Sequence, residues 1–212
     1  MTDMARSVWT PAQVREIDRM AVGYCGIPGY ELMTRAGEAA FGIACQRWPE
    51  ARRWLVLCGA GNNGGDGLAA VRHLGLQACR IALLAEPSAS KSPDAALQLR
   101  ILRAAGCEVT VGELPAATPA DAVWIDALFG TGLDRPLAGR AREWVEAFNV
   151  AAGKKLAIDI PSGLHGDTGE VLGAACEVDV TVTFVARKRG LTCADGPRCA
   201  GRIVVAGLGL PH

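Results

Sequence analysis

Short apolar segments alternate with helix-type segments through most of this 212-residue chain. The pattern predicts strands at Trp54–Cys58, Arg80–Leu84, Glu108–Val111, Ala122–Asp126, Leu156–Asp159, Val178–Phe184 and Arg202–Ala206, and helices at Leu68–Leu76, Asp94–Ala105 and Arg140–Ala151. Strands that are apolar throughout and separated by helices are typical of a parallel sheet buried on both faces. We therefore expect an α/β protein: three layers, α/β/α, around a mostly parallel central sheet.

Two further helices are expected before the first strand. Thr10-Pro11-Ala12-Gln13 combines an N-cap, a proline at the first helical position and a glutamine placed for a capping box. A second helix runs from about Tyr30 to Arg47 and carries many small residues, which permit close packing on this sheet or on a second copy of the chain. The alternation resumes unchanged beyond the 85–93 loop, so residues 1–212 are expected to form a single domain.

Composition excludes several classes of partner. The 22 basic and 22 acidic residues cancel, which argues against nucleic acid or an anionic membrane surface as the main partner. No apolar run is long enough to span a bilayer, and the start of the chain lacks a signal-peptide apolar segment. We expect a cytoplasmic protein whose eight cysteines are reduced, with no zinc site among its three widely spaced histidines.

Glycine-rich turns with polar side chains follow three of the expected strands. The turns are GAGNNGGDG at 59–67, Asp126 followed by ALFGTGL, and Asp159 followed by IPSGL. Ligands of open parallel sheets bind beyond the carboxyl ends of the strands, so all three turns should open on one edge. Each turn alone is a common turn former; their convergence predicts a ligand site.

One interpretation of Gly59-x-Gly61-x-x-Gly64 is the dinucleotide fingerprint of a dehydrogenase, with Glu86 as the acidic residue after the next strand. Three features count against it: some fifty residues precede the strand, no catalytic histidine or lysine pairing stands out, and Asp66 lies where a pyrophosphate would have to sit. The alternative uses the oxygens of Asn63, Asp126 and Ser162, which suit a hard cation of low charge. Glycine amides beside that cation could hold a phosphate, so the ligand is expected to be nucleotide-like.

The motifs resemble those of the NAD(P)H-hydrate epimerase family, the YjeF N-terminal domain. The match rests on Gly61-Asn62-Asn63-Gly64-Gly65-Asp66-Gly67, on the segments from Asp126 to Gly132 and from Asp159 to Gly163, and on Leu32-Met33-x-x-Ala36-Gly37 and Thr183-Phe184…Lys188-x-Gly190-Leu191. Ala60 departs from the proline that the family often has. The resemblance implies a Rossmann-like fold and an isomerase that interconverts the R and S C6 hydrates of NADH and NADPH for coenzyme repair.

The resemblance also implies a site. One potassium ion (K+) per subunit would be held by Asn63, Asp126 and Ser162. The hydrated dinucleotide would contact three groups of residues: Asn62, Asn63, Gly64, Gly65 and Asp66; Gly130, Thr131, Gly132, Leu133, Asp134, Arg135 and Pro136; and Asp159. Family members work with an S-specific NAD(P)H-hydrate dehydratase, often fused at the C-terminus, and generally form homodimers. The chain is therefore expected to be a stand-alone epimerase or a fragment of a fused protein.

A mechanism follows from the chemistry of the hydrate, whose C6 carries both a ring nitrogen and a hydroxyl. Protonation lets the hydroxyl leave, the nitrogen stabilises the planar cation, and water returns to the other face. This needs an acid–base group near C6, for which Asp159 is the first candidate and Lys188 the second. Alternatives stay open: Lys188 could lie on a solvated basic turn, Asp66 could merely order its loop, and the chain could be a non-catalytic binding module.

Overall fold

The chain folds around one all-parallel sheet. A computed structural model describes residues 7–74, 78–115 and 121–210. Its seven-stranded sheet has the order β4-β3-β2-β5-β6-β7-β9. The strands are β2 (Trp54–Cys58), β3 (Cys79–Leu83), β4 (Val109–Val111), β5 (Val123–Ala127), β6 (Lys154–Ile158), β7 (Val180–Phe184) and β9 (Arg202–Ala206). Each strand begins and ends within two residues of the prediction, because the apolar runs that predict them are the segments buried in the sheet.

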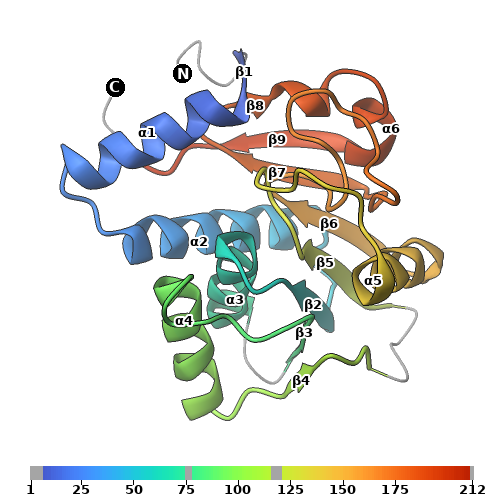
Figure 1. The fold of residues 1–212 in the computed structure, drawn as a ribbon. Coiled ribbons are helices and arrows are strands. Elements are labelled where there is room, and N and C mark those ends of the chain that lie inside the picture. The colour runs from blue at the N-terminus through green and yellow to red at the C-terminus, as the bar shows by residue number, and fades with distance from the viewer. Residues whose placement is uncertain (1–6, 75–77, 116–120, 211–212) are drawn as a thin grey trace.

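Helices cover both faces of this sheet (Figure 1). The helices are α1 (Pro11–Gly23), α2 (Gly29–Arg47), α3 (Asn62–Leu74), α4 (Pro93–Ala104), α5 (Gly139–Val150) and the short α6 (Gly196–Ala200). One core cluster joins α2, α3 and α4 to the sheet, and a second joins α5, through Trp144, Val145 and Phe148, to the opposite face. The predicted three-layer α/β/α sandwich is confirmed.

The two N-terminal helices form as expected. Thr10 caps α1: its hydroxyl accepts from the Gln13 amide at 3.3 Å, and the Gln13 side chain accepts from the Thr10 amide at 2.8 Å. Small residues of α2 pack within this chain: Ala36, Gly37 and Ala40 are buried, and Gly37 lies against α3. A Cβ on Gly37 would lie 2.6 Å from the backbone of α3, so only glycine permits that approach.

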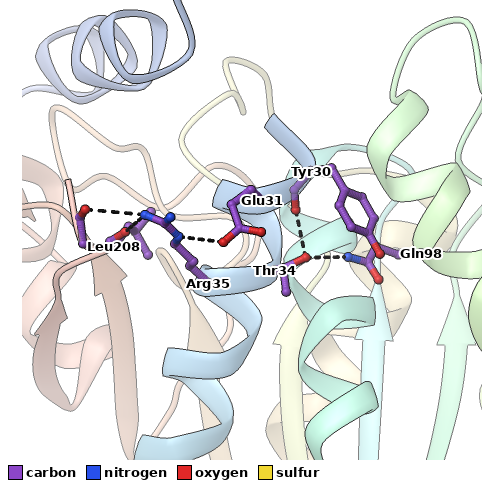
Figure 2. Close-up of polar contacts among 7 residues, drawn as sticks. Tyr30, Glu31, Thr34, Arg35, Gln98 and Leu208 are labelled. Atoms are coloured by element: carbon purple, nitrogen blue, oxygen red, sulfur yellow. Dashed lines mark hydrogen bonds and ion pairs between the residues drawn. The ribbon is translucent and has the colours of Figure 1, made fainter. Parts of the chain in front are cut away.

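Helix α2 is also tied to its neighbours by polar contacts (Figure 2). The Thr34 hydroxyl donates to the Tyr30 carbonyl at 2.8 Å and accepts from Gln98 of α4 at 3.3 Å. On the other side of the helix, Arg35 pairs with Glu31 and donates to the Leu208 carbonyl at 3.0 Å. These contacts fix α2 between α4 and the C-terminal segment.

The structure differs from the prediction around the first glycine-rich turn. Helix α3 begins at Asn62, six residues before the expected Leu68, so most of the predicted loop is helical. Glycine is a poor helix former, but a Cβ on Gly64 would lie 1.9 Å from the Gly59 carbonyl, and one on Gly65 would lie 2.4 Å from Met33. Close packing therefore explains why glycine occupies positions 64 and 65 of this helix. The predicted helix end at Leu76 falls outside the described residues.

Two other features of the fold were not predicted from the sequence. Strand β1 (Val8–Trp9) pairs in parallel with β8 (Arg187–Lys188), and this places Trp9 opposite Lys188. A 3-10 turn, Arg189–Leu191, follows β8. Across the described ranges, the helices do not combine the length and the apolar character that crossing a bilayer requires.

Candidate functional site

The three glycine-rich turns meet at one edge of the sheet. β5 lies between β2 and β6, with Cys58 opposite Ala127 and Asp126 opposite Ala157. Because all these strands are parallel, the segments that follow them leave the sheet together, as predicted. They border a cleft of about 1310 Å³ that also reaches α1, α2 and the start of α4.

Most of the predicted substrate residues line this cleft. They are Asn62, Asn63, Asp66, Gly130, Thr131, Gly132, Leu133, Asp134, Arg135 and Asp159, together with Lys188. Gly64, Gly65 and Pro136 do not line it: the two glycines are buried in helix packing, and Pro136 is exposed beside it. Asp126 and Ser162 lie beneath the cleft wall, both almost fully buried.

Asp159 and Lys188 form an ion pair in the cleft. The Lys188 ammonium lies 2.5 Å from the Asp159 carboxylate and donates to the Phe184 carbonyl at 2.8 Å. The side chain of Lys188 is 1% exposed and that of Asp159 is 15% exposed, so the solvated-turn interpretation of Lys188 is wrong. Asp159 has φ of 69°, a left-handed conformation that costs free energy in most residues and that aspartate tolerates better than most.

Asp126 organises the turns beneath the cleft. Its carboxylate accepts from the Leu128 amide at 3.1 Å, from the Ser162 amide at 2.7 Å and from the Ser162 hydroxyl at 2.6 Å. The same hydroxyl accepts from the Phe129 amide at 2.8 Å. Burial raises the pKa of Asp126, and its hydrogen bonds with Ser162 and Leu128 oppose that rise. These bonds join the end of β5 to the turn after β6.

Asn63 lies next to the turn after β5. An added Cβ on Gly130 would lie 3.3 Å from the Asn63 side chain and 3.3 Å from the Asp159 carboxylate, so the glycine lets the three segments approach one another. Both polar atoms of the Asn63 amide are buried and have no hydrogen-bond partner among the described residues. Buried amides are normally satisfied, so this one indicates a missing ligand.

Two further carboxyl groups, those of Asp66 and Asp18, lie near the ion pair. Burial raises the pKa of Asp66 well above its usual range, and the nearby charges of Asp159 and Asp18 add to the rise while Lys188 opposes it. Asp18 also has a raised pKa, mainly from burial, with Lys188 lowering it and Asp159 raising it. Three carboxyl groups and one ammonium therefore interact in one cleft.

The N-terminal helix supplies cleft residues that sequence reasoning missed. Arg15, Asp18 and Arg19 of α1 line the cleft, and Arg15 donates to the Thr131 carbonyl at 3.5 Å. The sequence gives no motif for them, because they are ordinary polar positions of an amphipathic helix. Only the docking of α1 across the open edge identifies them.

Glu86, the acidic residue of the dehydrogenase interpretation, points elsewhere. Its carboxylate pairs with Arg103 of α4 at 2.6 Å on the exposed surface, and it does not line the cleft. The residue expected to hold a ribose is thus absent from the site. This placement removes the main structural support for that interpretation.

Together, the parallel sheet and the cleft at its carboxyl edge define an α/β protein with a candidate ligand site at the ends of its strands. The family model described as YjeF-related protein N-terminus matches residues 29–190. The chain belongs to this family.

Relatives agree with that assignment, and a solved structure has the same fold. The chain is 40% identical to the NAD(P)H-hydrate epimerase of Rhodopirellula baltica, over 95% of this chain and 84% of that protein. It is 37% identical to the enzyme of that name from Limosilactobacillus fermentum, covering 96% and 97%. It is 41% identical to the bifunctional NAD(P)H-hydrate repair enzyme Nnr of Coxiella burnetii, but spans only 40% of its length. The crystal structure of yeast ynu0, YNL200c, shares the fold, with a TM-score of 0.78 at 21% identity, covering 95% of this chain and 88% of that one.

Proposed function

We propose that this chain is an NAD(P)H-hydrate epimerase, an isomerase that interconverts the R and S hydrates of NADH and NADPH. Two relatives that it matches over most of their length carry that name. The observation that carries the proposal is the buried Asp159–Lys188 pair, which opens into the cleft between the strand-end motifs. A non-catalytic module would have no use for a desolvated ion pair at that position.

The chain's own residues suit the proposed chemistry. Asp159 lies in the cleft as an acid–base group for the C6 hydroxyl, and its contact with Lys188 holds its orientation. The Gly130–Arg135 turn and Asn62 line the space that the rest of the dinucleotide would occupy. No electrons are transferred in the reaction, so no redox cofactor is needed.

A potassium ion is part of the proposal. Asn63 fits it, because its buried amide oxygen has no partner, and Asp126 and Ser162 add two buried oxygens, although these already bond to each other. This all-oxygen donor set suits a hard monovalent cation, which would supply positive charge beside the ligand. The test is the change in melting temperature that hydrated NADH causes, measured in KCl and in tetramethylammonium chloride. The change should be larger in KCl, and Asn63→Ala should remove the difference between the two salts. Equal shifts for the wild-type chain would exclude a specific cation.

The activity is tested by supplying mixed hydrate epimers with a separate S-specific dehydratase. Without an epimerase, the S fraction is repaired quickly and the rest slowly. Adding this protein should make NADH recovery fast and complete, and Asp159→Asn should remove that effect. Unchanged recovery with a folded protein in potassium buffer would leave a binding module as the better interpretation.

The proposal has three further parts: the functional partner, the location in the cell and the oligomeric state. The functional partner is an NAD(P)H-hydrate dehydratase, because bifunctional repair enzymes contain a region similar to this chain in about 40% of their length. We also propose a cytoplasmic homodimer. Met20, Val22 and Tyr24 leave exposed apolar surface on α1 that a second copy could cover, and light scattering with size exclusion would measure the mass.

A further inference from the structure

Inversion at C6 places a geometric demand on the site, given the proposed function. The hydroxyl leaves from one face of the ring and water returns to the other. A carboxyl group fixed in the cleft reaches only one face of a bound ring, so the second face needs its own acid–base group or a ring that turns over between the two steps.

Asp159 is fixed in this sense. Its amide donates to the Val182 carbonyl at 2.7 Å, and its carboxylate is held by the buried Lys188. Asp66 lines the same cleft but comes from α3, on the helical layer above the sheet. The two carboxyl groups thus approach the cleft from different elements and are close enough for their charges to interact.

Asp66 also lacks any other role in the fold. Within the described residues its carboxyl, which is partly exposed to the cleft, is given no hydrogen bond or ion pair. Asn63, three residues earlier on α3, has a buried amide without a partner. An unpaired carboxyl and an unsatisfied amide on one helix, both lining one cleft, indicate a polar ligand that both contact.

We propose that Asp66 is the second acid–base group and serves the face of the ring opposite Asp159. In one direction the Asp66 carboxyl gives its proton to the C6 hydroxyl, the C–O bond breaks, and water leaves while the ring nitrogen's electron pair stabilises the cation. A second water then forms the new C–O bond on the other face and gives a proton to the Asp159 carboxylate. The reverse direction exchanges the two roles, and solvent resets the protons.

The raised pKa of Asp66 supports this assignment. Burial and the neighbouring carboxylates keep it protonated further toward neutral pH than an ordinary aspartate, which suits a proton donor. Asp159, by contrast, is paired with the ammonium of Lys188. The two carboxyl groups of the site therefore lie in different environments, as the two groups of a paired acid–base mechanism do.

Oxygen exchange separates this proposal from a single-group mechanism. Each purified hydrate epimer is incubated in H2(18)O with the full chain, and label uptake and epimerisation are followed by mass spectrometry and chromatography, with the uncatalysed rates subtracted. Wild type should epimerise and label both epimers. Asp66→Asn should lose epimerisation by at least about 100-fold. It should still label one epimer, because Asp159 can expel and readmit water on its own face. Asp159→Asn should label only the other.

The possible results are distinct. Epimerisation by Asp66→Asn at the wild-type rate overturns the proposal, and so does loss of labelling of both epimers in a folded variant. Failure of the wild-type chain to epimerise overturns the proposed function instead. Asp121→Asn, which removes a surface carboxylate paired with Arg53, is the matched control. Asp66→Ser is put through the same assay if the asparagine variant does not fold.

Discussion

Asp126 and Asp159 look alike in the sequence and differ in the structure. Both follow apolar segments on adjacent parallel strands, and both precede a glycine-containing turn. Asp126 is fully buried and accepts hydrogen bonds from Leu128 and Ser162. Asp159 has a left-handed backbone, faces the cleft and pairs with Lys188. The position after a strand thus brings a carboxylate to the edge of the sheet that borders the cleft, and its partners decide whether it joins the turns beneath the cleft or faces the cleft itself.

The largest expected effect comes from Asp159→Asn. Asparagine tolerates the left-handed φ and keeps the shape of the side chain, so the fold should survive. Removing an acid–base group should lower kcat/KM by about 100-fold to 10,000-fold. The coupled dehydratase assay measures the rate, and circular dichroism confirms the fold. Activity close to that of wild type would contradict the role given to Asp159.

Lys188→Met tests the partner of Asp159. Breaking a buried ion pair by removing one member leaves an uncompensated charge and costs about 3 to 5 kcal/mol. Chemical denaturation should therefore show a large loss of stability, with Asp159 now unpaired. Adding Asp159→Asn to that variant should recover part of the loss, because the stranded carboxylate is gone. Additive effects in the double variant would mean that the two side chains do not interact energetically.

The placement of the two aspartates could be predicted from the sequence, because it depends on local patterns of apolar residues. Apolar runs such as Trp54–Cys58 become strands, and parallel strands bring Asp126 and Asp159 to one edge. The burial of Lys188 could not be predicted: in the sequence it stands between two arginines, and the contacts that bury it, with β1 and with Asp159, are distant in the sequence.

Other parts of the site depend on contacts that are distant in the sequence. Helix α3 begins at Asn62 because backbone and side chains from other elements pack on Gly64 and Gly65, which overrides the poor helix propensity of glycine. Asp18 reaches the cleft only because α1 lies across the edge of the sheet. No spacing within either segment carries that information.

Asp126→Ala should damage the structure more than Asp159→Asn does. It leaves the buried amides of Leu128 and Ser162 without their acceptor, at a cost of about 2 to 3 kcal/mol. For a protein of this size, each 1 kcal/mol lowers Tm by about 2–4 °C. Calorimetry on the two variants gives the comparison directly. A larger loss for Asp159→Asn would reverse the roles that we assign to the two aspartates.

The smallest expected effect is a pH dependence of stability that comes from Asp66. Because its pKa is raised in the folded state, the folded chain keeps a proton that the unfolded chain releases. The stability that this group contributes is therefore complete below its unfolded pKa and is lost as pH rises toward the folded value. Asp66→Asn has no such proton, so its Tm relative to wild type should increase as pH rises from the unfolded-state pKa of aspartate toward the folded value.

Asp121→Asn, on the surface, should show no such trend and corrects for the general effect of pH on the fold. A Tm difference for Asp66→Asn that stays constant across this range would mean that the carboxyl titrates normally in the folded chain. In that case Asp66 would not be kept protonated toward neutral pH, and the acid would have to come from another group of the cleft.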